Sequence, residues 1–209
     1  MTGADLIIPQ RAAGVVLFAH GSGSSRHSPR NKYVATQLRE ARLGTLLIDL
    51  LTPEEDETYR TRFDIGLLTQ RLADAARSLA REPQAQDLPL GLFGASTGAA
   101  AALEVAAALP DAIRAVVSRG GRPDLASRDA LRKVQAPTLL IVGGGDTGVI
   151  ELNQQAYAAL GCVKHLAIVP GATHLFEEPG TLEEVARLAA EWFTRHLGAA
   201  APAGKGAKR

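Results

Sequence analysis

Short apolar runs alternate with longer amphipathic segments along the chain. The apolar runs cover residues 15–19, 45–50, 88–93, 112–118, 137–142 and 165–169, and a shorter one lies at 6–8. Segments with apolar positions at helical spacing separate them, at residues 29–40, 64–79, 99–109, 125–133, 149–160 and 181–197. Continuous apolar runs are typical of strands buried on both faces. The pattern therefore predicts an α/β fold, a mainly parallel central sheet with helices on both faces.

Segment boundaries add local detail to this pattern. The run at 6–8 is expected to be one short edge strand, and residues 51–63 a polar, charged connection. Thr181, with Glu184 three residues later, predicts a capping box at the start of the last helix. Residues 1–197 are expected to form a single domain, followed by a disordered tail at 198–209 that is rich in alanine, glycine and lysine.

Composition narrows the classes of partner. The 209 residues are 46% hydrophobic and 22% charged, with a net charge of +1, which gives no reason to expect nucleic acid or a membrane as a partner. Residues 1–19 lack the layout of a signal peptide, and Cys162 is the single cysteine, so we expect a cytoplasmic protein without a disulfide. One cysteine and 5 scattered histidines predict no metal site and no cofactor.

The strongest chemical signal is the sequence Gly-Ala-Ser-Thr-Gly at residues 94–98. An apolar run precedes it and an alanine-rich helical segment follows it. Strand, G-x-S-x-G and helix is the context of a nucleophile elbow, in which a tight turn exposes the hydroxyl of Ser96. The alternative is a glycine-rich turn in which Ser96 caps the following helix.

Two further polar residues follow later strands. A serine hydroxyl needs a general base, and His174, directly after the last strand, is the best candidate. Asp146 follows three glycines at the end of another strand and is placed to orient that histidine. His174 as a loop residue, Asp146 as a helix cap and Asp124 as the rival acid remain open alternatives.

An oxyanion hole needs two backbone N–H groups. Thr97, the residue after the candidate nucleophile, is expected to supply one, and Ser22, in the glycine-serine loop after the first buried strand, the other. His20, at the start of that loop, is expected to be structural rather than catalytic.

These motifs together resemble the α/β-hydrolase fold. His20-Gly21, the elbow, Gly145-Asp146 and residues 172–174 carry the resemblance, and residues 49–55 and 169–180 resemble small bacterial members of the dienelactone hydrolase-like group. The resemblance implies a Ser96–Asp146–His174 triad. Dienelactone hydrolases proper have a cysteine in the elbow, so a general serine esterase is the safer inference. The short connection between residues 118 and 138 predicts that no cap domain covers the site.

A set of basic residues lies in the loops near the predicted site. Any of them is suited to bind a carboxylate or phosphate of a substrate, although solvated or ion-paired side chains are the commoner arrangement. These candidates are Arg26, His27, Arg30, Arg60 and Arg62.

The sequence thus predicts a serine hydrolase that cleaves carboxylic esters of small molecules, with thioesters or lactones as related substrates. The expected oligomeric state is a monomer or homodimer. A non-catalytic binding or regulatory module with the same fold is the main alternative, and peptidase or amidase activity a weaker one.

Overall fold

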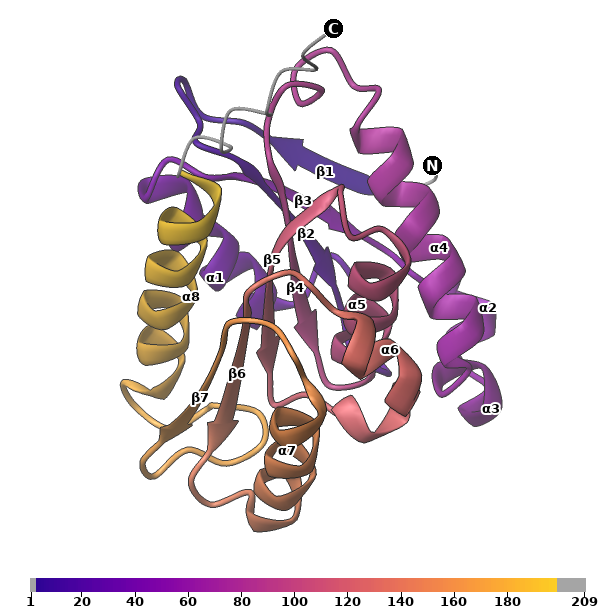
Figure 1. The fold of residues 1–209 in the computed structure, drawn as a ribbon, viewed down its shortest axis with the longest axis vertical. Helices are drawn as coiled ribbons and strands as arrows, with labels where there is room; N and C mark the ends of the chain where they lie inside the picture. The colour runs from indigo at the N-terminus through magenta and orange to yellow at the C-terminus, as the bar shows by residue number, and fades with distance from the viewer. Residues whose placement is uncertain (1–2, 199–209) are drawn as a thin grey trace, which may run out of the picture.

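The computed structural model describes residues 3–198, which form a three-layer α/β structure (Figure 1). Its sheet has seven strands in the order β1-β3-β2-β4-β5-β6-β7, and only β1 runs antiparallel to its neighbour. The strands are β1 Ala4–Ile7, β2 Val15–Ala19, β3 Gly44–Ile48, β4 Leu90–Ala95, β5 Ile113–Arg119, β6 Thr138–Gly143 and β7 Lys164–Val169. The predicted mainly parallel sheet is confirmed, and β1 lies close to the short edge strand expected at 6–8.

Helices cover both faces of this sheet, as predicted. Helices α1 and α8 pack on one face, and α4, α5, α6 and α7 contribute to the other (Figure 1). The long helices are α1 Pro29–Glu40, α4 Ile65–Leu79, α5 Thr97–Ala108, α7 Thr147–Ala159 and α8 Thr181–Leu197. The short ones are α2 Pro53–Asp56, α3 Tyr59–Arg62, the 3₁₀ turn η1 Pro123–Leu125 and α6 Arg128–Lys133.

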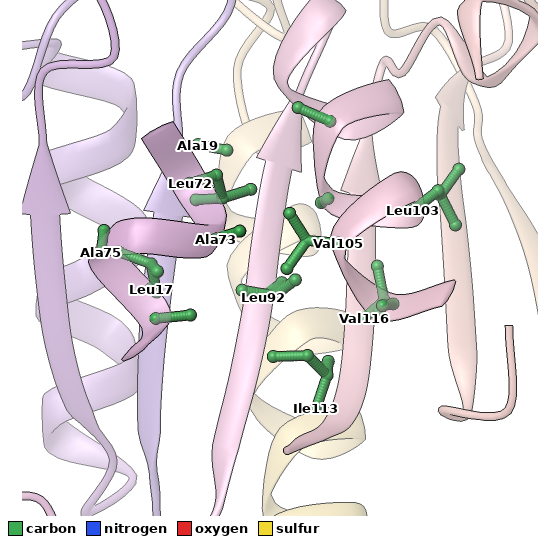
Figure 2. Packing of buried hydrophobic residues seen from close by; sticks show 14 of the residues in the cluster. Leu17, Ala19, Leu72, Ala73, Ala75, Leu92, Leu103, Val105, Ile113 and Val116 are labelled. Carbon is green, nitrogen blue, oxygen red and sulfur yellow. The ribbon is translucent and has the colours of Figure 1, made fainter. Parts of the chain in front are cut away.

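The core has two parts, one on each face of the sheet, because the side chains of the central strands are buried on both faces. Figure 2 shows Leu72 and Ala73 of α4 and Val105 of α5 beside Leu17 and Leu92 of the sheet. The small alanines of α5 let this helix approach the sheet closely, and every residue from Ala99 to Leu103 is fully buried. This packing holds the elbow between β4 and α5 in a rigid setting.

The connection at residues 51–63 is more ordered than the sequence pattern predicts. Thr52 and Glu55 form a capping box that starts α2, and Arg71 of α4 binds both carboxylate oxygens of Glu55, at 2.5 and 2.7 Å. This ion pair lowers the pKa of Glu55 to about 2. A helix of four residues is too short to show helical periodicity in the sequence, so α2 and α3 are seen only in the structure.

The capping box predicted for the last helix is wrong. The cap residue of α8 is Gly180, in the left-handed conformation, and Thr181 is the first helical residue. The Thr181 hydroxyl donates to the carbonyl of Glu178, while the carboxylate of Glu184 binds Arg187. Gly180 takes the cap position because its φ of +82° suits glycine.

The connection from Arg119 to Thr138 holds η1 and α6, and no cap domain is inserted there. The disordered tail predicted at 198–209 lies outside the described residues except for Gly198. Between residues 3 and 198, no helix is both long enough and apolar enough to cross a bilayer.

Candidate active site

The candidate site residues follow the carboxyl ends of different parallel strands. Ser22 follows β2, Ser96 follows β4, Asp146 follows β6 and His174 follows β7. Carboxyl ends of parallel strands meet at one edge of a sheet, which is where sites form in open α/β folds. The sheet order therefore brings these four segments to the same edge.

Ser96 has a strained backbone between β4 and α5. Its φ is 49° and its ψ −121°, a conformation that L-residues rarely adopt. Gly94 and Gly98 make the turn possible: a Cβ on Gly94 would lie 2.5 Å from the Cα of Ala99, and one on Gly98 would lie 2.3 Å from the carbonyl oxygen of Ala19. The Ser96 side chain makes no capping bond to α5, so the helix-cap alternative does not describe it.

His174 and Asp146 are joined directly. The Nδ1 atom of His174 lies 2.6 Å from the Oδ2 atom of Asp146, in a half-buried pair. Asp146 makes no side-chain cap to α7, although it precedes that helix. The rival acid, Asp124, is instead bound by Arg122 through two bonds of 2.7 and 2.8 Å. The geometry therefore favours Asp146 over Asp124 as the partner of His174.

The end of β5 lies next to both Ser96 and His174. The N–H of Ser96 donates to the carbonyl of Arg119 at 3.3 Å. A Cβ on the next residue, Gly120, would lie 3.7 Å from the Cε1 atom of His174. Within residues 3–198, the hydrogen bond of the His174 ring is to Asp146, and none joins the ring to the Ser96 hydroxyl.

The loop after β2 lies against the elbow. A Cβ on Gly21 would come within 2.9 Å of the Cβ of Ser96, so only glycine permits this approach. The N–H of Gly23 donates to the Asp56 carboxylate at 3.1 Å, and Arg62 pairs with the same carboxylate. These contacts hold the loop that carries Ser22 next to the start of α5.

His20 has a structural role at the base of this loop. It is 4% exposed, its Nε2 atom accepts the N–H of Leu50 at 2.9 Å, and its Nδ1 atom lies 2.9 Å from the carbonyl of Gly21. This pattern requires a neutral ring with the proton on Nδ1. Burial lowers the pKa of His20 below its usual value of 6.5, against smaller opposing effects of the Gly21 bond and of Asp49 and Asp56.

The lowered pKa of His20 predicts acid sensitivity. Below about pH 6.5, His20 is protonated in the unfolded chain but stays neutral in the folded protein, because its pKa there is lower. The free energy of unfolding should therefore fall as the pH drops below about 6.5. For this one group the fall is at most about 1.4 kcal/mol per pH unit. Urea unfolding at a series of pH values measures this slope. His20→Gln should reduce this slope. Equal slopes in wild type and His20→Gln would contradict this role.

Among solved structures, a dienelactone hydrolase from Anabaena variabilis is 58% identical to this chain, with a TM-score of 0.90. The match covers 92% of this chain and 91% of the other. The chain belongs to the dienelactone hydrolase family. No protein-family model matches the chain.

More distant structures share the fold of this dienelactone hydrolase family member. Est1E from Butyrivibrio proteoclasticus is 16% identical, with a TM-score of 0.79 and coverage of 94% of each chain. A monoacylglycerol lipase from Paleococcus ferrophilus is 18% identical, with a TM-score of 0.71 and coverage of 92% of this chain and 98% of the lipase. These likenesses show the α/β-hydrolase fold alone.

Two curated proteins of Mycobacterium tuberculosis, from strains H37Rv and CDC 1551, are named as candidate phosphoribosyl transferases. Each is 59% identical over 199 residues, which cover 95% of this chain and 45% of the relative. The chain thus spans about half the length of the curated relatives it matches. Their name describes a whole protein of which more than half has no counterpart here.

The predicted substrate-binding residues differ in their ion-pair partners and in their exposure. The guanidinium of Arg26 binds Asp49, and that of Arg62 binds Asp56, so both side chains form ion pairs within the chain. Arg30 pairs with Glu177 at 2.8 Å, while its Nε atom is enclosed without a partner. His27 and Arg60 are exposed. Within residues 3–198, no group of three or more acidic, histidine or cysteine side chains is arranged to hold a metal ion.

Two arginines beside the elbow were missed by sequence reasoning. The N–H of Arg122 donates to the carbonyl of Ser96 at 3.1 Å, and Arg119 is the last residue of β5. The available signal was a charged residue directly after an apolar run and before Gly120-Gly121. The predicted strand ends at residue 118 with the apolar run, whereas β5 continues through Arg119.

Proposed function

We propose that this chain is a serine hydrolase that cleaves carboxylic esters of small molecules, with thioesters and lactones as related substrates. The observation that carries the proposal is the 2.6 Å hydrogen bond between His174 and Asp146. The nearby Ser96 has the strained backbone of a nucleophile elbow, with a φ of 49°. Membership of the dienelactone hydrolase family supports the same reaction class.

The proposed mechanism assigns one role to each group. Ser96 attacks the acyl carbonyl, and His174 takes its proton through Nε2, because Nδ1 is engaged by Asp146. Asp146 stabilises the imidazolium that forms. His174 then gives the proton to the leaving alcohol, and water releases the acid from the acyl-enzyme.

Two backbone N–H groups are proposed to bind the developing oxyanion. Thr97 is the first residue of α5, so its N–H has no acceptor within the helix and lies at the positive end of the helix dipole. Ser22 follows Gly21, which packs against Ser96. Each donor contributes about 10²- to 10³-fold in rate in known oxyanion holes.

Covalent labelling tests the nucleophile directly. We expect a fluorophosphonate probe to modify the wild-type chain once, at Ser96, as read by peptide mass spectrometry, and to compete with p-nitrophenyl butyrate hydrolysis. Ser78→Ala, on α4 away from the site, is the matched control and should label like wild type. Absence of labelling together with absence of hydrolysis of short acyl esters would favour the non-catalytic binding module instead.

A further inference from the structure

Strand β7 forms an open edge of the sheet. Within the described residues it pairs with β6 alone, and it is the outer strand on that side in Figure 1. The carbonyls of Val163 and Val169 accept backbone N–H groups at the start of β6 and just past its end. Backbone groups alternate in direction along a strand, so Lys164, Leu166 and Ile168 direct their N–H and carbonyl groups away from β6. This edge therefore offers a row of backbone donors and acceptors to another strand.

The edge lacks the features that commonly keep a strand from pairing. Natural edge strands are blocked by prolines, by bulges or by charged side chains at the open side. Strand β7 has 6 residues, none of them proline, and a continuous register with β6. Its one lysine, Lys164, donates its ammonium to the carbonyls of Tyr157 and Leu160, each at 2.6 Å. A second strand on this edge would therefore leave no lysine charge without a partner.

The surface around this edge is apolar and poor in charge. The side chains of Val163 and Ile168 are 64% and 42% exposed. Helix α7, which packs over β6 and β7, carries one charged residue, Glu151, among its 13 residues. Its exposed positions Gln154 and Ala158 are uncharged. Depletion of charge is the compositional signal that distinguishes a protein interface from the rest of a surface.

We propose that a second copy of this chain pairs with β7 as an antiparallel strand, so that the protein is a homodimer. A two-fold axis at Leu166 places this residue opposite its own copy and Lys164 opposite Ile168 of the other copy. These are the three residues whose backbone groups point outward. Their N–H and carbonyl groups bond across the axis, and the two sheets join into one.

Helix α7 favours a second copy over an unrelated extended peptide. Because α7 runs from the end of β6 back to the start of β7, the axis places the first half of one α7 beside the last turn of the other. Glu151 of each copy then lies toward the end at which Lys164 of the other copy holds its ammonium. Ile150 and Tyr157 lie two turns apart on the side of α7 that contacts Lys164, and they supply apolar contact between the helices. A peptide would occupy the strand position but leave this side of α7 uncovered.

The mass in solution tests the interface. Light scattering coupled to gel filtration, over a dilution series, should give wild type twice the chain mass of 21.9 kDa. Ile168→Lys places a charge on the paired edge and should give the mass of one chain. Ile7→Lys makes the same change on β1 at the opposite edge, where Ile7 is 49% exposed, and should stay dimeric. Circular dichroism checks that both variants fold. A single-chain mass for wild type, or an unchanged dimer for Ile168→Lys, would overturn the proposal.

A cysteine pair tests the register without relying on disruption. In a Cys162→Ser background, Leu166→Cys should form a disulfide between copies on mild oxidation, read by non-reducing electrophoresis. Residues opposite each other in such a pair have Cα atoms about 5.5 Å apart, which is within disulfide reach. Val163→Cys is the control, because Val163 is more exposed but lies opposite Val169 of the other copy. Faster cross-linking through Val163→Cys than through Leu166→Cys would indicate random collision and would contradict the two-fold pairing.

Discussion

Ser96→Ala is expected to lower kcat/KM for p-nitrophenyl butyrate by about 10⁴-fold or more, to the level set by the oxyanion donors and substrate binding alone. The reason is chemical, because alanine leaves no atom to attack the carbonyl or form an acyl-enzyme. Steady-state kinetics on purified wild type and variant measure the loss.

The fold should tolerate this change. The Ser96 side chain caps no helix, and alanine differs from serine by one atom at the same strained φ. We therefore expect melting temperatures within about 3 °C, which corresponds to less than about 1 kcal/mol in a domain of this size. Ser78→Ala again serves as the control. A Ser96→Ala variant that melts like wild type and retains full activity would exclude Ser96 as the nucleophile.

Asp146→Asn is expected to lower kcat by about 10³- to 10⁴-fold without displacing the side chain. The carboxylate accepts the Nδ1–H of His174, which leaves Nε2 free to take a proton. An amide of the same shape carries no charge to stabilise the imidazolium, and its NH₂ group favours the wrong tautomer of the ring. The effect should therefore fall mainly on kcat rather than on KM.

Asp124→Asn provides the matched control for this prediction. It makes the same chemical change on the neighbouring acid, whose carboxylate is bound by Arg122 rather than by His174. We expect less than about a tenfold loss, because a half-exposed ion pair contributes little. The opposite result, with Asp124→Asn inactive and Asp146→Asn active, would reassign the acid.

Local sequence was sufficient for the elements that repeat a clear period. The strands from residue 15 onward and the long helices lie within a few residues of their predicted positions. Each of these elements is buried on one or two faces, so its apolar residues follow the spacing of a helix or a strand. Helices α2 and α3 were missed because four residues show no period. The cap of α8 was predicted at Thr181 but lies at Gly180, because the left-handed turn before the helix requires glycine.

The basic residues illustrate what the sequence leaves open. Arg26, Arg30 and Arg62 all lie in polar segments of the sequence, but their partners in the fold differ. Arg26 pairs with Asp49 and Arg62 with Asp56, whereas Arg30 pairs with the exposed Glu177. Arg119 follows the predicted strand at 112–118 and precedes two glycines, yet its side chain is buried. Ion pairs between distant segments depend on the path of each loop, which no local pattern encodes.

The sequence by itself determined the α/β class and the elbow around Ser96, because both follow from local rules: the period of burial and the space that glycine leaves in a tight turn. Only the tertiary structure decided which acid reaches His174, which arginines are already paired, and that Arg119 is buried at the end of β5. Those facts depend on the order of strands in the sheet, which brings the ends of β4, β5, β6 and β7 together although they are far apart along the chain.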